Sequence, residues 1–152
     1  QLPNIKGSVM RRDYKDWIEI LELDLGLQRS VRMLTGVQTN RLTSGPKFNE
    51  LSVVKYFDKA SPLIFQQTFH SKDEMSTVII EVCDTIGPYL KYELSNVYIS
   101  QRHVASFTDI HSLETFKLSY DKIQETYIER GTQGEMLAPI SSGFDLQTMT
   151  KL

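Results

Sequence analysis

Short runs of alternating hydrophobic and polar residues dominate the chain, and this alternation is typical of strands with one buried and one solvated face. The run WIEILELDL shows it most clearly, because Leu21, Leu23 and Leu25 fall on one face of a predicted strand. The acidic side chains of Glu22 and Asp24 fall on the opposite face. This pattern predicts a strand that covers a hydrophobic core.

Other segments follow the same pattern and outline the predicted architecture. Strands are expected at 17–25, 51–57, 77–83, 89–100 and 116–128. A bulge is expected near Ser95 and Asn96, and the pair Gly87-Pro88 predicts a turn. The polar segment 103–112 is predicted to be a loop.

One helix is predicted, over residues 61–71. The Ser61 hydroxyl can accept a hydrogen bond from a backbone N–H at the helix start. Pro62 suits the first helical position, because its missing N–H is not needed there. Phe65 and Phe69 are four residues apart and therefore share a face of this helix.

Two segments lack a periodic pattern. The first, from Gly26 to Phe48, holds apolar residues among its polar ones, at Val31, Met33, Leu34, Val37 and Leu42. A solvated loop and a segment that docks on a partner both stay open, although the five apolar residues favour docking. The second segment, 131–152, is rich in Gly, Thr and Ser. It predicts a tail on the surface or on a neighbouring subunit, following a single β domain over 1–130.

Composition supports a mainly β fold. Of 152 residues, three are Ala, whereas Val, Ile and Thr number 33 and aromatic residues 15. Alanine is the strongest helix former, and β-branched and aromatic side chains suit strands, so a helical bundle is excluded. A chain of this length buries about 68–70% of its unfolded surface, which requires no disulfide or metal.

The charge and the hydropathy exclude two function classes. Seventeen basic and nineteen acidic residues leave a formal net charge of −2, so no basic field attracts a nucleic acid. No apolar run reaches the roughly 20 residues of a membrane-spanning helix. The single cysteine, Cys83, is predicted to be a small core residue of a soluble protein made in a reducing compartment.

No pattern of residues predicts catalysis or cofactor binding. The three histidines lack the spacing of a metal site, and the glycines form no nucleotide-binding loop. No serine lies in a Gly-x-Ser-x-Gly turn. We therefore expect no catalytic residue, no cofactor and no metal, although an enzyme stays possible because catalytic triads are spatial arrangements.

The segment 45–65 is more specific and reads GPKFNELSVVKYFDKASPLIF. It resembles the hallmark segment of the haemolysin-coregulated protein (Hcp) family, the tube protein of bacterial type VI secretion systems. In that family a glycine-rich loop leads into an L-S-V-x-K-Y-x-D strand and then a Ser-Pro helix start. The matching residues here are Lys55, Tyr56, Asp58, Lys59, Ser61 and Pro62.

Shorter matches extend the resemblance over nearly the whole chain. They are Ile5-Lys6-Gly7-Ser8, the strand at 17–26, the run YELSNVYIS at 92–100 and Gly143-Phe144-Asp145-Leu146. Three features depart from the family pattern. Gly45-Pro46-Lys47 replaces Gly-Lys-Pro, and the long loop holds few glycines. Little more than residues 2–4 precedes Ile5, so either residues were lost before the first strand or the barrel lacks part of that strand.

The resemblance implies a two-sheet β-barrel with one short flanking α-helix near residues 61–71. Six subunits would form a ring, and rings would stack into a hollow tube that a contracting sheath propels into a target cell. Implied partners are further copies of the chain, the sheath, tip-spike and baseplate proteins, and small effectors in the lumen. The implied location is the bacterial cytoplasm during assembly, followed by secretion or delivery into a target cell.

The resemblance also assigns roles to particular residues. Contact with the next ring is expected from Arg29, Val31, Arg32, Met33, Leu34, Val37, Arg41, Leu42 and Lys47. The motif at 55–62 is expected to orient the strand-to-helix corner or a subunit contact. Glu22 and Asp24 are expected either on the lumen or on an outer solvated face. Contacts of the tail are expected from Phe144, Asp145 and Leu146.

Three other functions stay open at the level of sequence. A tail-tube protein of a phage-like contractile particle would share the architecture, and the motif at 55–62 favours secretion over it. A monomeric β-barrel could bind a small ligand in its mouth, although side chains fill the interior of a small barrel. A secreted enzyme is the third.

Overall fold

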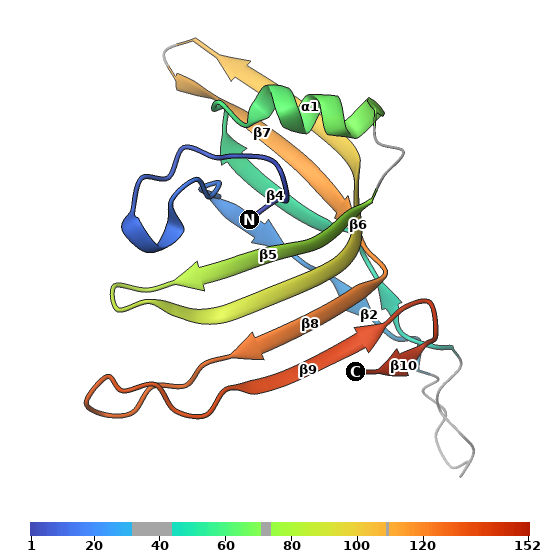
Figure 1. Ribbon diagram of the computed structural model, residues 1–152. Coiled ribbons are helices and arrows are strands. Elements are labelled where there is room, and N and C mark those ends of the chain that lie inside the picture. Colours follow the sequence, from blue (N-terminus) through green and yellow to red (C-terminus); the bar gives the residue numbers. More distant parts are fainter. Residues whose placement is uncertain (32–43, 71–73, 109) are drawn as a thin grey trace.

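The computed structural model describes residues 1–31, 44–70, 74–108 and 110–152 (Figure 1). In chain order its elements are the 3-10 helix η1 (Arg12–Tyr14), β1 (Glu22–Asp24), β2 (Leu27–Gln28), β3 (Lys47–Phe48), β4 (Leu51–Tyr56), α1 (Ser61–His70), β5 (Met75–Cys83), β6 (Pro88–Phe107), β7 (Ile110–Ser119), β8 (Lys122–Tyr127), β9 (Ile140–Asp145) and β10 (Thr150–Lys151). The mainly β fold and the helix predicted near 61–71 are confirmed.

Two antiparallel layers share the long strand β6. In one layer the strand order is β1, β4, β7, and β7 pairs with the second half of β6. In the other layer, β5 and β8 flank the first half of β6, and β9 and β10 continue beyond β8. Apolar side chains of both layers form one core, which includes Leu51, Val78, Leu94 and Leu118. Among the described residues, β1 and β5 each pair with one named strand, so the barrel is open between them.

Strand β6 changes partner at Asn96. Ser95 still pairs with Lys122 of β8, whereas Tyr98 already pairs with Ser119 of β7. Asn96 has a φ of 55°, a left-handed conformation that asparagine tolerates better than most residues. Its side-chain amide donates a hydrogen bond to Asp121 Oδ2 at 3.1 Å. The predicted bulge near Ser95 and Asn96 is replaced by this change of partner, and the nearest register shift of β6 lies later, between Ile99 and Gln101. The change of partner lets one strand serve both layers.

Two strand boundaries differ from the sequence prediction. The segment 103–112, predicted as a loop, belongs to β6 and β7, which pair out to Phe107 and Ile110. Its polar residues form the solvated surface of a hairpin. The run 116–128 is divided between β7 and β8, because the chain turns at residues 120–121.

The strand predicted at 17–25 shortens to β1. Leu23 and Leu25 pack against the core as expected, but Leu21 is 49% exposed. Ile18 and Ile20 take the inward positions before it. The alternation therefore shifts by one residue at Leu21, and the prediction that Leu21 shares a face with Leu23 is wrong.

The segments without periodicity contain more structure than predicted. At the base of the segment 26–48, β2 pairs with β3 in a two-stranded ribbon. Within 131–152, β9 pairs with β8 along its whole length, and β10 pairs with the end of β9. The segment predicted as a tail therefore extends the sheet, because its backbone continues the ladder of β8.

Candidate functional site

The family motif converges on a buried ionic cluster where β4 leads into α1. The Lys55 ammonium is fully buried and donates hydrogen bonds to Asp58 Oδ1 at 2.7 Å and to the Tyr56 carbonyl at 2.7 Å. It also donates to Ser61 Oγ and to Glu114 Oε2 of β7, both at 3.0 Å. Arg102 of β6 donates from Nε to the other Glu114 oxygen at 2.5 Å. This corner cluster consists of Lys55, Asp58, Ser61, Arg102 and Glu114.

Ser61 joins this cluster instead of capping the helix as predicted. Its hydroxyl donates to Glu114 Oε2 at 2.6 Å and accepts from the Asp58 N–H at 3.0 Å. The residue before the helix is Ala60, whose carbonyl accepts the Ile64 N–H at 3.0 Å. The Ala60 N–H in turn donates to Asp58 Oδ1 at 2.9 Å. Asp58 therefore organises the helix start, and Pro62 is the second helical residue.

The electrostatics of the corner cluster are balanced. Burial alone would raise the pKa of Asp58, but the hydrogen bond and charge of Lys55 and the N–H of Ala60 outweigh it and hold this pKa below its usual value. Glu114 is fully buried between Lys55 and Arg102. Removing one member of such a cluster leaves another charge buried without its partner, which is strongly destabilising. The cluster thus fixes how β4, α1, β6 and β7 meet.

The corner cluster lacks the properties of a catalytic dyad. Ser61 and Lys55 are both buried with no exposed surface, so a substrate cannot reach the hydroxyl. The Ser61 hydroxyl already donates its proton to Glu114. The Lys55 ammonium lies between two carboxylates, 2.7 Å from Asp58 Oδ1 and 3.0 Å from Glu114 Oε2, so its N–H groups are already engaged within the subunit. The arrangement therefore supports a structural role.

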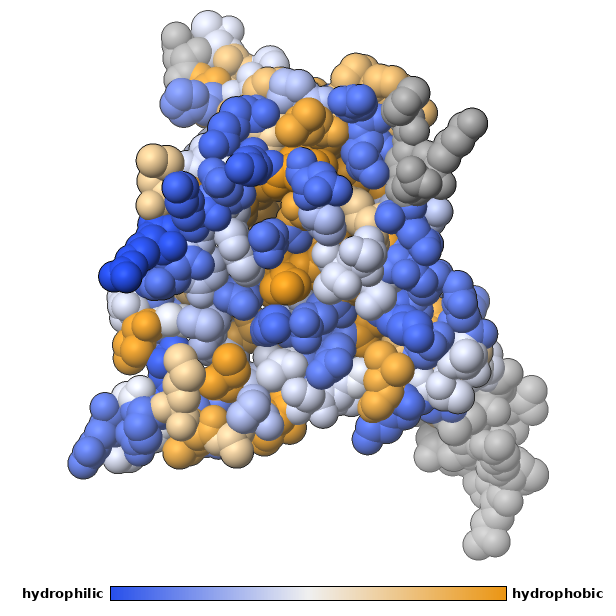
Figure 2. Space-filling model, in the orientation of Figure 1, coloured by the Kyte–Doolittle hydropathy of each residue, from blue (hydrophilic) through white to orange (hydrophobic). Residues whose placement is uncertain are grey.

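Exposed aromatic rings surround the corner cluster on the side of α1. The Arg102 guanidinium carbon lies 5.2 Å from the centroid of Phe65 and 5.9 Å from that of Phe57. Phe65 and Phe69 pack edge to face at 4.9 Å, and both are more than half exposed. Figure 2 shows hydrophobic groups gathered over this part of the molecule. The remaining motif residues Tyr56, Lys59 and Pro62 are also exposed.

The predicted stacking segment is described only at its base. There Leu27 is 63% and Val31 49% exposed, and Lys47 lies on the exposed side of β3. Arg29 Nε donates to the Ser44 carbonyl at 3.4 Å, which ties the two arms together. The other expected contact residues lie outside the described residues; they are Arg32, Met33, Leu34, Val37, Arg41 and Leu42.

The three predicted tail contacts face into this subunit. Phe144 stacks on Phe48 of β3 with 5.2 Å between ring centroids. Asp145 is buried and pairs with Lys122 at 2.9 Å, and the Lys122 hydrogen bond with the N–H of Thr148 holds the pKa of Asp145 below its usual value. Leu146 packs against the core. These side chains attach the ribbon β2–β3 and the turn after β9 to the body.

The predicted lumen pair, Glu22 and Asp24, is exposed on the edge strand β1. Asp24 pairs through its backbone with Ser52 of β4 and borders a shallow polar hollow that Glu50 and Lys117 also line. Because both side chains are exposed in the single subunit, their position agrees equally with a lumen-facing and with an outer solvated surface.

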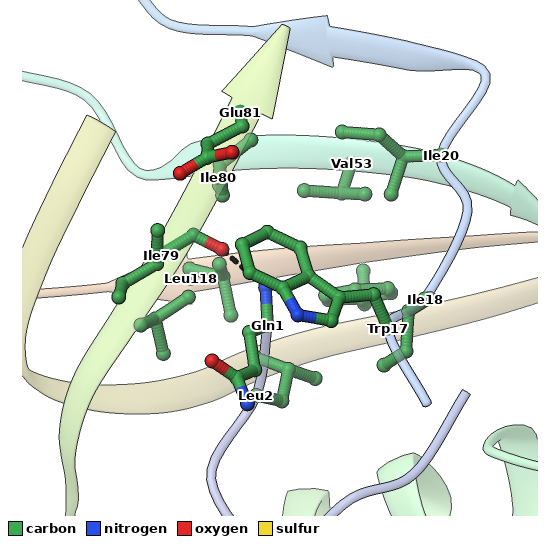
Figure 3. Close-up of a pocket in the computed structure, with 12 residues that line it drawn as sticks. Gln1, Leu2, Trp17, Ile18, Ile20, Val53, Ile79, Ile80, Glu81 and Leu118 are labelled. Atoms are coloured by element: carbon green, nitrogen blue, oxygen red, sulfur yellow. Dashed lines mark hydrogen bonds between the residues drawn. The ribbon is translucent and has the colours of Figure 1, made fainter. Parts of the chain in front are cut away.

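A small apolar cavity lies at the open seam of the barrel. Its volume is about 50 Å³, and Trp17, Ile18 and Ile20 line it together with side chains of β4, β5 and β7. Figure 3 shows the Trp17 ring beside Gln1, which forms backbone hydrogen bonds with Ile79 of β5. Drug-sized ligands occupy pockets of about 300–1,000 Å³, so this cavity does not support the ligand-binding alternative.

Cys83 lies near this seam but not in the core. Its side chain is exposed, and its thiol donates to the Tyr14 hydroxyl at 3.3 Å. Tyr14 in turn donates to Glu81 Oε2 at 2.9 Å. The prediction of a core cysteine is wrong, because Cys83 ends β5 where the strand leaves the body.

Among the described residues, no group of three or more His, Cys, Asp or Glu side chains is placed to hold a metal ion. In the same part of the chain, no helix is long and apolar enough to cross a membrane.

Comparison with known proteins places the chain in a family. The sequence model described as "Type VI secretion system effector, Hcp" matches residues 1–127. One similar solved structure is that of a type six secretion system protein. The match spans 100% of this chain and 96% of that chain, with 22% identity and a TM-score of 0.92. Hcp1 from Salmonella typhimurium matches with 22% identity, coverage of 100% and 95%, and a TM-score of 0.81.

A third similar structure is a type VI secretion system effector from Yersinia pestis. It has 17% identity, coverage of 95% of this chain and 96% of that chain, and a TM-score of 0.78. No curated protein matches the sequence. The structural matches agree with the mainly β fold, and the sequence model covers most of the chain, so this protein belongs to the Hcp family of type VI secretion system proteins.

Proposed function

We propose that this chain is the structural tube subunit of a type VI secretion system. Six copies form a ring, and the rings stack into a hollow tube whose lumen holds small effectors. The sheath, tip-spike and baseplate proteins are its other partners. The subunit assembles in the bacterial cytoplasm and then leaves the cell or enters a target cell. It acts without catalysis.

The observation that carries this proposal is the exposed apolar surface at the base of the segment 26–48. Leu27 and Val31 are exposed at the end of a ribbon that Phe48 and Phe144 anchor to the body. A monomer gains nothing from exposing these side chains, whereas a contact with another copy would bury them. Such a contact between different surfaces of identical chains is heterologous, and it generates rings or open filaments.

The oligomeric state tests the ring. Light scattering should give a solution mass near six times 17.5 kDa, and electron microscopy should show rings with an open centre. Monomers in both measurements would contradict the proposal.

Deleting residues 33–43 tests the stacking role of the loop separately. The variant should form rings that no longer stack into tubes, because five of the proposed stacking residues are removed while the ribbon base with Leu27 and Val31 remains. Normal tubes from this variant would contradict the stacking role and leave the ring standing. Circular dichroism provides the control that the variant is folded.

A further inference from the structure

A hollow lies between the ribbon β2–β3 and the sheet strands β8, β9 and β10. Its volume is about 380 Å³, which falls within the range of about 300–1,000 Å³ for pockets that bind small molecules. Leu25, Leu27 and Phe48 line it on one side, and side chains of β8, β9 and β10 line it on the other. Figure 1 shows β2, β9 and β10 on the same side of the molecule as the C-terminus. We call this space the ribbon hollow.

The apolar lining of the ribbon hollow is already in place in the subunit. Phe48 and Phe144 stack with 5.2 Å between their ring centroids, and both line the hollow. Ile123 is 6% exposed and belongs to the core, so its position is fixed. A ligand that packs on these side chains does not have to order them first, which lowers the cost of binding.

Polar side chains occupy core-facing positions at the ribbon hollow. Ile123 pairs with Phe144, and both pack with the core. Two residues further along each strand, Glu125 pairs with Ser142, and because strand side chains alternate, this pair faces the same side. A packed core places apolar residues at such positions unless another function requires polar ones. The carboxylate and the hydroxyl line the hollow instead of filling it.

Two opposite charges line this apolar space. Burial, followed by the hydrogen bond to Glu125, raises the pKa of Tyr92 to about 12, so the phenol stays protonated beside that carboxylate. Lys151 pairs through its backbone with Phe144 and also lines the hollow. Within the described part of the chain, the Lys151 ammonium has no hydrogen bond or ion pair. The hollow therefore offers one acceptor of positive charge and one unpaired donor of positive charge.

We propose that the ribbon hollow binds a small zwitterion with an apolar side chain, which is the chemistry of a free apolar α-amino acid. The ligand's ammonium binds the Glu125 carboxylate, and its carboxylate binds the Lys151 ammonium. Its side chain packs on the rings of Phe48 and Phe144. A ligand with a single charge is disfavoured, because a cation meets Lys151 and an anion meets Glu125.

This site goes beyond the proposed tube subunit and does not depend on it. Every residue that lines the ribbon hollow belongs to one chain. Binding can therefore be measured on the full chain whether or not rings form. Its failure would leave the tube proposal standing, and the absence of rings would leave the binding site standing.

Three related probes test the charge requirement by saturation-transfer NMR. L-Phenylalanine should show saturable binding with a Kd of about 1 mM, as expected for a ligand of this size in a partly open pocket. N-acetyl-phenylalanine lacks the ammonium, and phenylalaninamide lacks the carboxylate. Each should bind about three- to ten-fold more weakly, because one charged hydrogen bond is lost. Equal binding of all three probes would overturn the zwitterion as the ligand class.

Variants assign the two charges to their residues. Lys151→Gln should weaken the binding of L-phenylalanine about three- to ten-fold, but should not weaken phenylalaninamide further, because that probe has no carboxylate to lose. Glu125→Gln should do the same for L-phenylalanine and leave N-acetyl-phenylalanine unchanged. Lys91→Gln is the matched control, since Lys91 lies on β6 next to Tyr92 and so faces the opposite side of the layer. It should leave all three affinities unchanged.

A variant that fills the ribbon hollow tests the location. Ser142→Leu adds an apolar side chain to the lining and should abolish binding, with circular dichroism as the control for folding. Undiminished binding by this variant would place the ligand elsewhere and overturn the site. If Ser142→Leu does not fold, the Lys151→Gln comparison decides, because that side chain is exposed. No saturable binding of L-phenylalanine to the wild-type chain would overturn the inference outright.

Discussion

The corner cluster and the exposed apolar residues of the subunit use their side chains in opposite ways. In the corner cluster, Lys55 and Glu114 are fully buried, and their charged groups have partners inside the subunit. By contrast, Val31 and Ile140 are large apolar residues that the subunit leaves exposed. The cluster satisfies itself within one chain, whereas the exposed residues gain burial only if another chain covers them. The strongest part of the family motif therefore maintains the subunit, and segments without a pattern carry the proposed assembly.

The largest expected effect comes from breaking the corner cluster. Lys55→Ala should lower the free energy of unfolding by about 3–5 kcal/mol, because Glu114 and Asp58 lose their buried partner. Lys59→Ala is the matched control, since Lys59 lies 3.8 Å from Asp16 with a side chain 54% exposed, and it should change stability by less than about 1 kcal/mol. Urea denaturation measures both. Equal effects would contradict a structural role for the cluster.

The next effect separates the inner and outer residues of one strand. Phe144→Ala should cost about 2 kcal/mol, below the range for fully buried aromatic residues because Phe144 is only partly buried. Ile140→Ala, on the same strand but 67% exposed, should stay within about 0.5 kcal/mol. The same urea measurement compares them. A larger loss for Ile140→Ala would contradict the exposure of this side chain and place it in the subunit core.

A smaller effect follows from the pKa of Asp58. This pKa is lowered in the folded state, so the ionised carboxylate stabilises the fold at pH values above its unfolded pKa near 3.8. That contribution is lost as the pH falls through the lower folded value. Unfolding free energies of wild type and Asp58→Asn, measured from pH 6 to pH 3, should converge as the pH falls. A constant difference would contradict the role of the charge.

The smallest effect on stability is expected at the edge strand β1. Asp24→Arg should leave the free energy of unfolding within about 0.5 kcal/mol, because Asp24 is exposed. Reversal of its charge should change the retention of effectors by assembled rings if the pair with Glu22 faces the lumen. Unchanged retention, with normal ring assembly, would place this pair on an outer surface.

The sequence predicts the parts of the fold that local patterns determine. The strand at 77–83 follows from its β-branched run, and the helix after Asp58 follows from its helix-start residues. The division at Tyr120 was missed because apolar alternation continues across it. The strand β9 was missed because the run ISSGFD has few apolar residues and is held by the ladder of β8.

The corner cluster is only half visible in the sequence. Lys55, Asp58 and Ser61 lie within seven residues and belong to one motif. Their partners Arg102 and Glu114 lie more than 40 residues further along the chain, on either side of the segment 103–112 that was predicted to be a loop. Only the pairing of β7 with β4 and β6 brings these charges to the cluster. Nothing in the sequence next to Glu114 indicates that its side chain is buried, because its partner Lys55 lies on a different strand.

The partner change of β6 at Asn96 has a mechanical consequence for a proposed tube that is driven forward. Layers held together only by side-chain packing can slide past each other under load. Here one continuous backbone is hydrogen-bonded into both layers, on either side of a single residue. A force applied to one layer is therefore transmitted to the other through the covalent backbone of β6. Separating the two layers requires the hydrogen bonds between β6 and its neighbouring strands to break.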